Sequence, residues 1–512
     1  METTSLIPHV GENYTLKLKN TMQEILSKLP KESPEFSHSI DALHELMQTK
    51  VDPPFDVIWV YSAIKFGCRK SLKGDNLEQI SAAKALFQLI SACSASVGGS
   101  KSIALLAPVV FMIHSVVKEL FELKREKKAM KEVKSLVDMI LGFMSICCSK
   151  ISEEEDLDLV LSLNDLARLW VDDDDDDAND GFETLLPLVS SDVCGWICGG
   201  KFHVGYLAGA VMMEVFLLKL CLFFDMGMEK GELEMYLKSW SVGSISSFQN
   251  VYFLEVLMRT TLETSLPLNS ILKAKDEFLL KKVLLDAVLL VEYSFIYENA
   301  KNIKSLALTR LILTHVAVEY LREFDQNRII SYSKAFSTSN LPSQIIKLVS
   351  NQNGIEENSG KTFGSSPRAL INWLLRLENL GIRVFEDDTL KSHAKLCPDI
   401  SQMEQSAAGT LDDKVTDEGL FFVDNVGEEE NAGEEDNQSK LISDAFVAAA
   451  QTMKSSDNES RKRKGKSSGK KVKFVKYDLN QKSVPVKGGT SASNDSSSDE
   501  SEVEDPNSDS DA

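Results

Sequence analysis

The chain has 512 residues, of which 43% are hydrophobic, and it carries a formal net charge of −21 at pH 7. This acidity excludes an electrostatic grip of the whole protein on nucleic acid or on an anionic membrane, so any such contact has to be local. The length exceeds what one ordinary compact core needs, so we expect either several domains or one elongated array of repeats.

The cysteines and the N-terminus indicate the compartment. The eight cysteines are scattered through apolar stretches, without the loop-bound spacing of a secreted disulfide framework. Residues 1–20, METTSLIPHVGENYTLKLKN, show neither the basic and apolar regions of a signal peptide nor the arginine-rich composition of a transit peptide. We therefore expect a protein of the cytosolic and nuclear side of the cell.

A helical spacing of apolar residues extends from residue 12 to about 381, with short breaks that contain Pro, Gly, Asn or Ser. This spacing predicts consecutive helices of ordinary length and no strands. The clearest predicted helices are 16–29, 56–68, 77–93, 109–123, 133–147, 157–170, 207–224, 248–262, 278–297 and 303–324. One last helix is expected around Trp373.

Several of these helices are apolar on more than one face, as in 281–296, KKVLLDAVLLVEYSFI, which indicates neighbours on two sides. In this general pattern the stretch resembles an armadillo or HEAT-type α-solenoid with about two helices per 40 residues, although it shows no repeat consensus. The expected fold class is all-α. It consists of a helical-repeat (armadillo- or HEAT-like) superhelix over 1–385, followed by a long disordered C-terminal tail. The alternative is a non-repetitive helical domain.

Two loops are expected within the body. Six consecutive aspartates begin the segment 172–180, which predicts a solvated acidic loop, with docking of a basic partner as an alternative role. Residues 350–366 predict a flexible loop.

Two further stretches of the body need interpretation. Residues 205–224, GYLAGAVMMEVFLLKLCLFF, are long enough to span a bilayer, but Glu214 and Lys219 interrupt them. We therefore expect a buried core helix. The basic stretch 124–134, KREKKAMKEVK, is expected to continue the helix from Val109 with a solvent-exposed face, and binding of an acidic partner is the alternative.

Two near-motifs overlap in the segment 194–203. Residues 195–201, GWICGGK, match the first seven positions of a phosphate-binding loop, but Phe202 replaces the Ser or Thr that would coordinate magnesium, so a turn between helices is expected. Cys194, Cys198 and His203, with Cys221 further on, are zinc-ligand types at a spacing unlike that of known zinc knuckles. Buried structural cysteines are expected instead.

The seven histidines are dispersed and stand in no recognisable catalytic arrangement. His114 and His315 lie within apolar helices and are expected to be satisfied core or groove residues. We therefore predict no catalytic residues, no metal site, no cofactor and no enzymatic activity.

The composition changes near the C-terminus, where residues 401–512 hold 24 acidic residues against 14 basic ones and few apolar residues. We predict an acidic disordered linker over 386–460 with two short docking segments, 419–424 and 441–453. The contacts are expected from Leu420, Phe421 and Phe422 in the first segment and from Ile442, Phe446 and Met453, on one helical face, in the second. Packing of these segments onto the protein's own body is the alternative.

A basic tract follows at 461–487, with 11 Lys or Arg against the single Asp478. Such a cluster resembles a nuclear localisation signal, whose extended Lys and Arg side chains importin-α would bind. The predicted signal consists of Arg461, Lys462, Arg463, Lys464, Lys466, Lys470, Lys471 and Lys473. We therefore expect the protein in the nucleus.

The end of this tract also mixes aromatic and basic residues. Phe474, Lys476 and Tyr477 suit phosphate contact and base stacking, so RNA binding is an alternative activity of the tail. The acidic residues that follow would compete with RNA for the basic tract.

The last segment, 488–512, is acidic and rich in serine. An acidic residue follows by three positions each of Ser496, Ser497, Ser501 and Ser508, the pattern that acidophilic kinases favour. Each phosphate would add about −1.5 to −2 charge and strengthen contacts with basic partners. A basic signal beside an acidic, serine-rich end is also typical of nucleolar and chromatin-associated proteins.

Together these features predict a non-enzymatic nuclear scaffold or adaptor whose body binds protein partners, in ribosome biogenesis or in transcription and chromatin. The alternative is a transport adaptor of importin-like architecture. That class should show Trp at regular helical spacing, whereas the five Trp residues are irregularly spaced.

Overall fold

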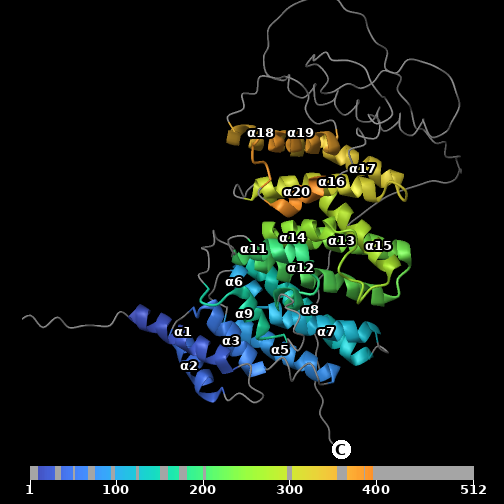
Figure 1. Cartoon of the computed structure of the whole chain (residues 1–512). Helices are drawn as coiled ribbons and strands as arrows, with labels where there is room; N and C mark the ends of the chain where they lie inside the picture. The colour runs from blue at the N-terminus through green and yellow to red at the C-terminus, as the bar shows by residue number, and fades with distance from the viewer. Residues whose placement is uncertain are drawn as a thin grey trace, which may run out of the picture. The chain divides into compact units, whose positions relative to one another are not determined.

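A computed structural model describes residues 10–28, 36–49, 52–66, 75–93, 99–122, 126–149, 159–171, 181–199, 203–296, 302–353, 366–385 and 387–395 (Figure 1). Every regular element within these ranges is a helix, and none of these residues forms a strand. The all-helical prediction is therefore confirmed for the described residues. The predicted linker, basic tract and acidic end lie outside them from residue 396 onward.

The first half of the body begins with α1 (Val10–Lys28), α2 (Ser37–Gln48), α3 (Phe55–Phe66) and α5 (Asn76–Cys93). It continues with α6 (Gly99–Ala104), α7 (Ala107–Glu122), α8 (Lys127–Cys148) and α9 (Leu163–Arg168). Consecutive helices pack against each other from α1 to α3, and α5 packs against both α7 and α8. The indole N–H of Trp59 in α3 donates to the carbonyl of Leu166 in α9 over 2.9 Å, which joins two elements far apart in sequence.

The second half begins with α10 (Gly181–Leu185), α11 (Ser191–Gly199), α12 (Val204–Phe223), η1 (Phe224–Met226) and α13 (Lys230–Phe248). It continues with α14 (Val251–Leu262), α15 (Ala274–Leu289), η2 (Ser294–Ile296) and α16 (Ile303–Tyr320). It ends with α17 (Gln326–Thr338), α18 (Leu341–Asn353), α19 (Pro367–Asn379) and α20 (Asp388–Lys395).

Each of the ten clearest predicted helices overlaps an observed helix. Several observed boundaries differ from the predicted ones because single residues begin or end the helix there. The predicted helix 157–170 begins only after Ser162, whose hydroxyl accepts the N–H of Asp165 and so caps α9. The predicted helix 248–262 is split, because Gln249 adopts a left-handed conformation (φ 48°) and ends α13. Asn250 then caps α14 by accepting the N–H of Phe253 over 2.9 Å.

Three further expectations about segments were wrong in part. The basic stretch 124–134 is not one continuous helix with the preceding segment, because Glu126 is extended and α8 begins only at Lys127. The helix α18 extends to Asn353, into the segment expected to be a loop. The helix α20 lies in the segment expected to be a linker and packs against α16 and α19, so the folded body reaches at least Lys395.

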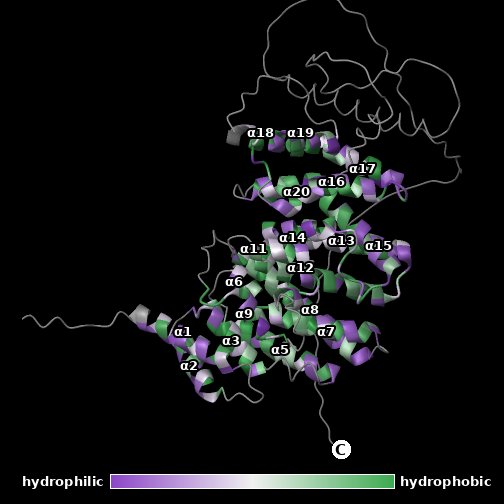
Figure 2. Ribbon diagram, in the orientation of Figure 1, coloured by the Kyte–Doolittle hydropathy of each residue, from purple (hydrophilic) through white to green (hydrophobic). Residues whose placement is uncertain are grey.

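The helix α12 is the centre of the body. Eighteen of its twenty residues are buried, and it packs against α6, α7, α8 and α14. Two helical segments, Gly99–Glu122 and Val204–Met226, are long and apolar enough to cross a membrane by length and composition, but 78% and 89% of their windows are buried among other helices. The prediction of a core helix at 205–224 is confirmed. Figure 2 shows that outer helices such as α1 and α15 instead mix hydrophilic and hydrophobic residues.

A close crossing joins α12 to α14. A Cβ atom on Gly209 would lie 2.7 Å from the carbonyl carbon of Tyr252 and 2.8 Å from the amide nitrogen of Phe253, both of them backbone atoms. Only a residue without a side chain fits this position, since neither backbone can move without shifting its helix.

From α12 onward the helices pack in two rows. One row contains α12, α14 and α16, and the second contains α13, α15 and α17, so that each helix contacts the helix two places later in the chain (Figure 1). In the second row the carboxylate of Asp286 in α15 pairs with Lys238 of α13 over 3.1 Å and with Arg328 of α17 over 3.1 Å. The hydroxyl of Tyr332 in α17 donates to Asp286 over 2.8 Å. One buried carboxylate therefore joins all three helices of this row.

A second buried carboxyl group lies within α12. The N–H of Leu188 donates to Glu214 Oε1 over 2.6 Å, and Oε2 has no hydrogen-bond partner that meets the same distance and angle limits among the described residues. Burial of this carboxyl group raises its pKa to about 8, since the charged form would lose its hydration.

We expect Gly209→Ala to lower the free energy of unfolding by roughly 1–3 kcal/mol, because the added methyl group forces α12 and α14 apart. Gly243→Ala in α13 is the matched control, since a Cβ there meets no atom within 4 Å. That change should raise stability by up to about 1 kcal/mol. Urea denaturation followed by circular dichroism measures both, and a Gly209→Ala protein as stable as the wild type would contradict the close crossing.

We also expect the wild type to lose stability relative to Glu214→Gln as the pH rises. The folded-state pKa of about 8 lies above the unfolded value of 4.5, so the folded protein binds more protons in that interval and is destabilised as they leave. The difference in unfolding free energy should grow by a few kcal/mol between pH 5 and pH 8. Parallel pH curves for the two proteins would show that Glu214 ionises normally.

Candidate functional site

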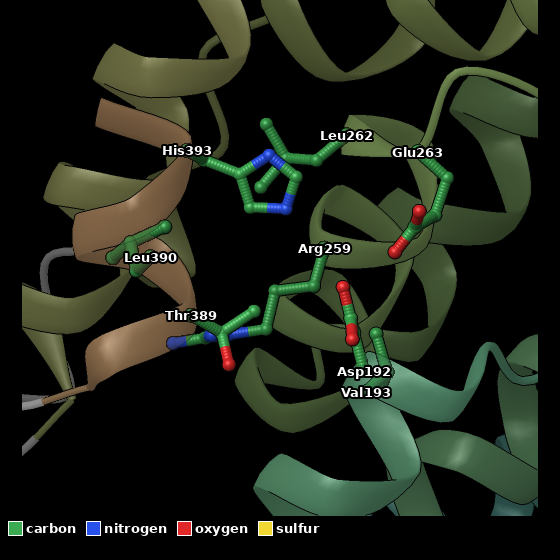
Figure 3. A pocket seen from close by; sticks show the side chains of 8 residues that line it. All are labelled: Asp192, Val193, Arg259, Leu262, Glu263, Thr389, Leu390 and His393. Carbon is green, nitrogen blue, oxygen red and sulfur yellow. The ribbon is translucent and has the colours of Figure 1, made fainter. Parts of the chain in front are cut away.

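A small cavity lies where α11, α14 and α20 meet (Figure 3). Its volume of about 10 Å³ is enough for roughly one water molecule. The residues that line it are Asp192, Val193, Arg259, Leu262, Glu263, Thr389, Leu390 and His393. This junction combines charged and apolar side chains from three segments that are far apart in sequence.

The position of α14 at this junction follows from both of its ends. Asn250 caps its N-terminus, and the chain leaves the helix at Glu263 with extended ψ. The ammonium group of Lys281 in α15 donates to the carbonyls of Glu263 and Thr264, and the second of these bonds measures 2.9 Å. A cation at the C-terminal carbonyls is favourable for a helix. Burial nevertheless lowers the pKa of Lys281 to about 8.

The guanidinium group of Arg259 is the charged centre of the junction. It donates to Glu255 Oε1, one helical turn away, over 3.2 Å, and to the carboxylate of Asp387 at the start of α20. Its carbon lies 3.8 Å above the centre of the Trp196 ring of α11. Arg259 therefore joins α11, α14 and the start of α20 through a combination of ion pairs and cation–π contact.

Glu255 connects this centre to the core. Its side chain is fully buried, accepts the hydroxyl of Tyr206 in α12 over 3.2 Å and accepts the hydroxyl of Ser305 in α16. Burial raises the pKa of Glu255, and the charge of Arg259 opposes that shift. Glu255 thus connects all three helices of the first row, α12, α14 and α16, as Asp286 connects those of the second.

The short helix α20 is held at its start by Asp387. Asp387 accepts the N–H of Thr389 over 2.9 Å and so caps the helix, while its other oxygen binds Arg259. Two of its own residues, Leu390 and Ala394, are buried. His393, in the last turn, faces the cavity from the other side (Figure 3).

Asp192, Glu263 and His393 offer potential metal-ligand atoms that all lie within 4.8 Å of one another. Asp192 is exposed, and Glu263 and His393 are half-buried. The hydroxyl of Ser190 donates to Glu263 Oε1 over 3.2 Å. Sequence reasoning missed this group because its members are 71 and 130 residues apart, and only the fold brings them together.

The phosphate-loop-like segment 195–201 and the cysteine and histidine group of 194–203 have structural roles. The helix α11 extends to Gly199, so most of 195–201 is helical rather than the expected turn. Cys194 and Cys221 are buried in the core, as expected, and Cys198 is half-buried. The ring of His203 stacks on Tyr252 with centroids 4.9 Å apart, and its Nδ1 accepts the N–H of Gly205.

His114 and His315 are both buried, as expected for core residues. Burial lowers the pKa of His114 to about 4, and burial also lowers the pKa of His315. Nε2 of His114 has no hydrogen-bond partner among the described residues. The expectation that this imidazole is satisfied was therefore wrong.

All residues predicted to carry function from the sequence lie outside the described residues. These are the localisation signal from Arg461 to Lys473, the docking residues Leu420 to Phe422 and Ile442 to Met453, the basic and aromatic residues Phe474 to Tyr477, and the serines from Ser496 to Ser508. The acidic loop 172–180 also lies outside the described ranges, between α9 and α10.

A second candidate surface lies on α8 and α13. These helices contact each other, and the hydroxyls of Ser145 and Ser247 meet at the surface over 3.3 Å. Ten solvent-facing positions near this contact are uncharged, although Asp138 and Lys238 beside them are also partly exposed. The ten positions are Met139, Gly142 and Ile146 on α8, Ser149 directly after it, and Met235, Tyr236, Ser239, Gly243, Ser246 and Ser247 on α13. We call these ten residues the α8–α13 face.

Comparison of the chain with protein-family models, curated proteins and solved structures gave no match.

We expect Arg259→Ala to lower the free energy of unfolding by about 3–5 kcal/mol, because Glu255 would remain buried without its cation. Arg322→Ala is the control, since Arg322 forms an exposed pair with Glu319 at i,i+3 and should cost less than about 1 kcal/mol. Arg259→Lys should be intermediate, because it keeps the charge but loses the second donor and the planar stacking. Equal losses for the two alanine variants, measured by urea denaturation, would contradict the assigned role of Arg259.

Proposed function

We propose that the protein is a non-enzymatic nuclear scaffold or adaptor whose helical body binds a protein partner through the α8–α13 face. The observation that carries this proposal is the composition of that face. In a chain with 26% charged residues, Met139 to Ser149 and Ser239 to Asn250 contain none. The charges that directly precede these two segments are engaged, since Asp138 pairs with Lys219 and Lys238 pairs with Asp286.

The exposed apolar side chains of this face are of the kinds that protein interfaces favour. Met235 is 69% exposed, Ile146 is 59% exposed, and Tyr236 is 39% exposed. Met and Tyr are enriched in protein–protein interfaces, whereas Lys, Glu and Asp are depleted there. Small residues such as Gly142 and Gly243 leave room for close approach of a partner helix, since no atom lies within 4 Å of their missing Cβ positions. The partner best suited to this face is an amphipathic helix with an apolar stripe.

The arrangement in rows supports a helical-repeat body as part of the proposal. In α-solenoids each helix packs on the equivalent helix of the next repeat, and the rows α12, α14, α16 and α13, α15, α17 follow that succession. Repeats of this kind present long surfaces to protein partners. The central burial of α12 among four helices is the feature that departs most from a regular stack.

An importin-like transport adaptor is the weaker candidate. That class needs tryptophans available to a bound peptide. Here Trp59 and Trp170 are fully buried, Trp240 stacks on Phe216, and Trp196 lies under Arg259. A second alternative, RNA binding, depends on Phe474, Lys476 and Tyr477 of the tail and requires no feature of the body.

In this proposal importin-α binds the basic tract and carries the protein into the nucleus. The acidic segments contact basic partners, and phosphorylation of the serine-rich end strengthens those contacts. Ribosome biogenesis, or transcription and chromatin, is the proposed setting, with the nucleolus as a proposed site within the nucleus. These assignments rest on the composition of the tail.

The test is proximity labelling of nuclear neighbours by the full chain in cells. We expect the double substitution Ile146→Glu and Met235→Glu to remain nuclear and folded but to lose its principal neighbours at least tenfold, because charge at the centre of an apolar contact is strongly unfavourable. Leu16→Glu is the matched control, since Leu16 is an exposed leucine on α1. Deletion of residues 461–473 should move the protein to the cytoplasm. Unchanged neighbours in the double variant, or unchanged nuclear accumulation after the deletion, would refute the corresponding half of the proposal.

A further inference from the structure

Three metal-ligating side chains from three separate segments border the cavity between α11, α14 and α20. Asp192 lies in the first turn of α11, Glu263 directly follows α14, and His393 lies in the last turn of α20. Figure 3 shows both carboxylates and the imidazole around the same space. We propose that Asp192, Glu263 and His393 bind a single Zn²⁺ ion, which holds α20 against α11 and α14.

The charge of this group suits a divalent cation. Two carboxylates and one neutral imidazole bring a charge of −2, which balances one Zn²⁺ ion. Arg259 also lines the cavity, but its charge is already engaged by Glu255 and Asp387. Figure 3 shows its guanidinium group beside Thr389, away from both carboxylates of the proposed site.

The other nearby polar groups are compatible with a bound ion. Lys281 approaches Glu263 from α15, where its ammonium donates to backbone carbonyls rather than to the carboxylate. The Ser190 hydroxyl donates to one Glu263 oxygen, a hydrogen bond of the kind that orients a ligating carboxylate from outside the coordination shell.

The donor set selects the metal. Imidazole is a ligand for zinc and related transition metals, whereas Mg²⁺ and Ca²⁺ prefer all-oxygen sites. Zinc binds nitrogen and oxygen ligands at roughly 2.0–2.2 Å, so tetrahedral ligands lie about 3.3–3.5 Å apart. The three ligand atoms lie within 4.8 Å of one another, so they need to approach by at most about 1.5 Å. Side-chain rotation suffices for this, since Asp192 is exposed and the other two are only half-buried.

The fourth coordination position would face the cavity, whose volume of about 10 Å³ accommodates a water molecule. The ion would join the last described helix of the body to helices some 130 and 200 residues earlier, next to the Arg259–Asp387 pair at the other end of α20. Binding would therefore increase the stability of α20 in particular. This inference is independent of the α8–α13 face, so neither proposal depends on the other.

The test uses the full chain, freed of metal with a chelator and then titrated with Zn²⁺, and with Co²⁺ as a spectroscopic probe. We expect one Zn²⁺ ion to bind per chain with a dissociation constant in the micromolar range or below. Zn²⁺ should also raise the melting temperature, because the ion binds only the folded state. Four-coordinate Co²⁺ should give a strong visible absorption. No near-ultraviolet thiolate band should accompany it, which matters because the chain contains eight cysteines.

Three variants identify the ligands. Asp192→Asn, Glu263→Gln and His393→Gln should each weaken Zn²⁺ binding by at least the roughly 10–100-fold that loss of an outer-shell partner costs. His38→Gln, an exposed histidine on α2, is the matched control and should bind as the wild type does. Zn²⁺ should also slow amide hydrogen exchange in α20 of the wild type and of the control, but not of the three variants.

Several outcomes would overturn the proposal. Equal affinity of the wild type and all three variants would place the metal elsewhere, for example on the acidic tail. A thiolate band with Co²⁺ would assign the ion to cysteines, and the absence of saturable Zn²⁺ binding would remove the site altogether. Circular dichroism of each variant without metal separates loss of ligation from loss of folding.

Discussion

The close crossing of α12 and α14 is the constraint on which the rest of the body depends. Two helices with full side chains pack about 8–10 Å apart, and only the missing side chain of Gly209 lets the backbone at Tyr252 approach α12. This approach brings Tyr206 within hydrogen-bonding distance of Glu255. Glu255 in turn orients Arg259, which reaches the start of α20. Glu255 and Arg259 also contact α16 through Ser305 and α11 through Trp196. The crossing at Gly209 therefore affects the positions of three further helices, α11, α16 and α20.

Buried charges give the helix rows their register. Helices that are buried along most of their length, such as α12 and α14, could rotate or slide with little change in buried area, so apolar packing alone specifies their positions poorly. Asp286 and Glu255 remove that freedom, because a shift of one turn would leave either carboxylate buried without its partners. Such pairs contribute little net stability compared with apolar substitutes, so their effect here is mainly on specificity.

The two proposed interaction sites differ in physical character because their surroundings differ. The α8–α13 face is exposed and uncharged, so it gains free energy only when a partner removes its Met and Ile side chains from water. The junction around Arg259 is charged, and its cavity of about 10 Å³ has room for an ion or a water molecule but for no larger ligand. The first site suits recognition of another protein, and the second suits stabilisation of the body where the predicted tail begins.

The sequence by itself determined the helical class, most helix positions and the burial of 205–224, because apolar spacing depends only on neighbours along one helix. It also defined the basic tract and the phosphorylatable serines, which remain predictions. It misplaced the boundaries at Ser162 and Gln249, where single capping residues outweighed the periodicity. Only the tertiary structure brought together Asp192, Glu263 and His393, and only it engaged Arg259 with Asp387. Contacts between residues more than 70 positions apart depend on how helices cross, and the spacing of apolar residues along each helix carries no information about that crossing.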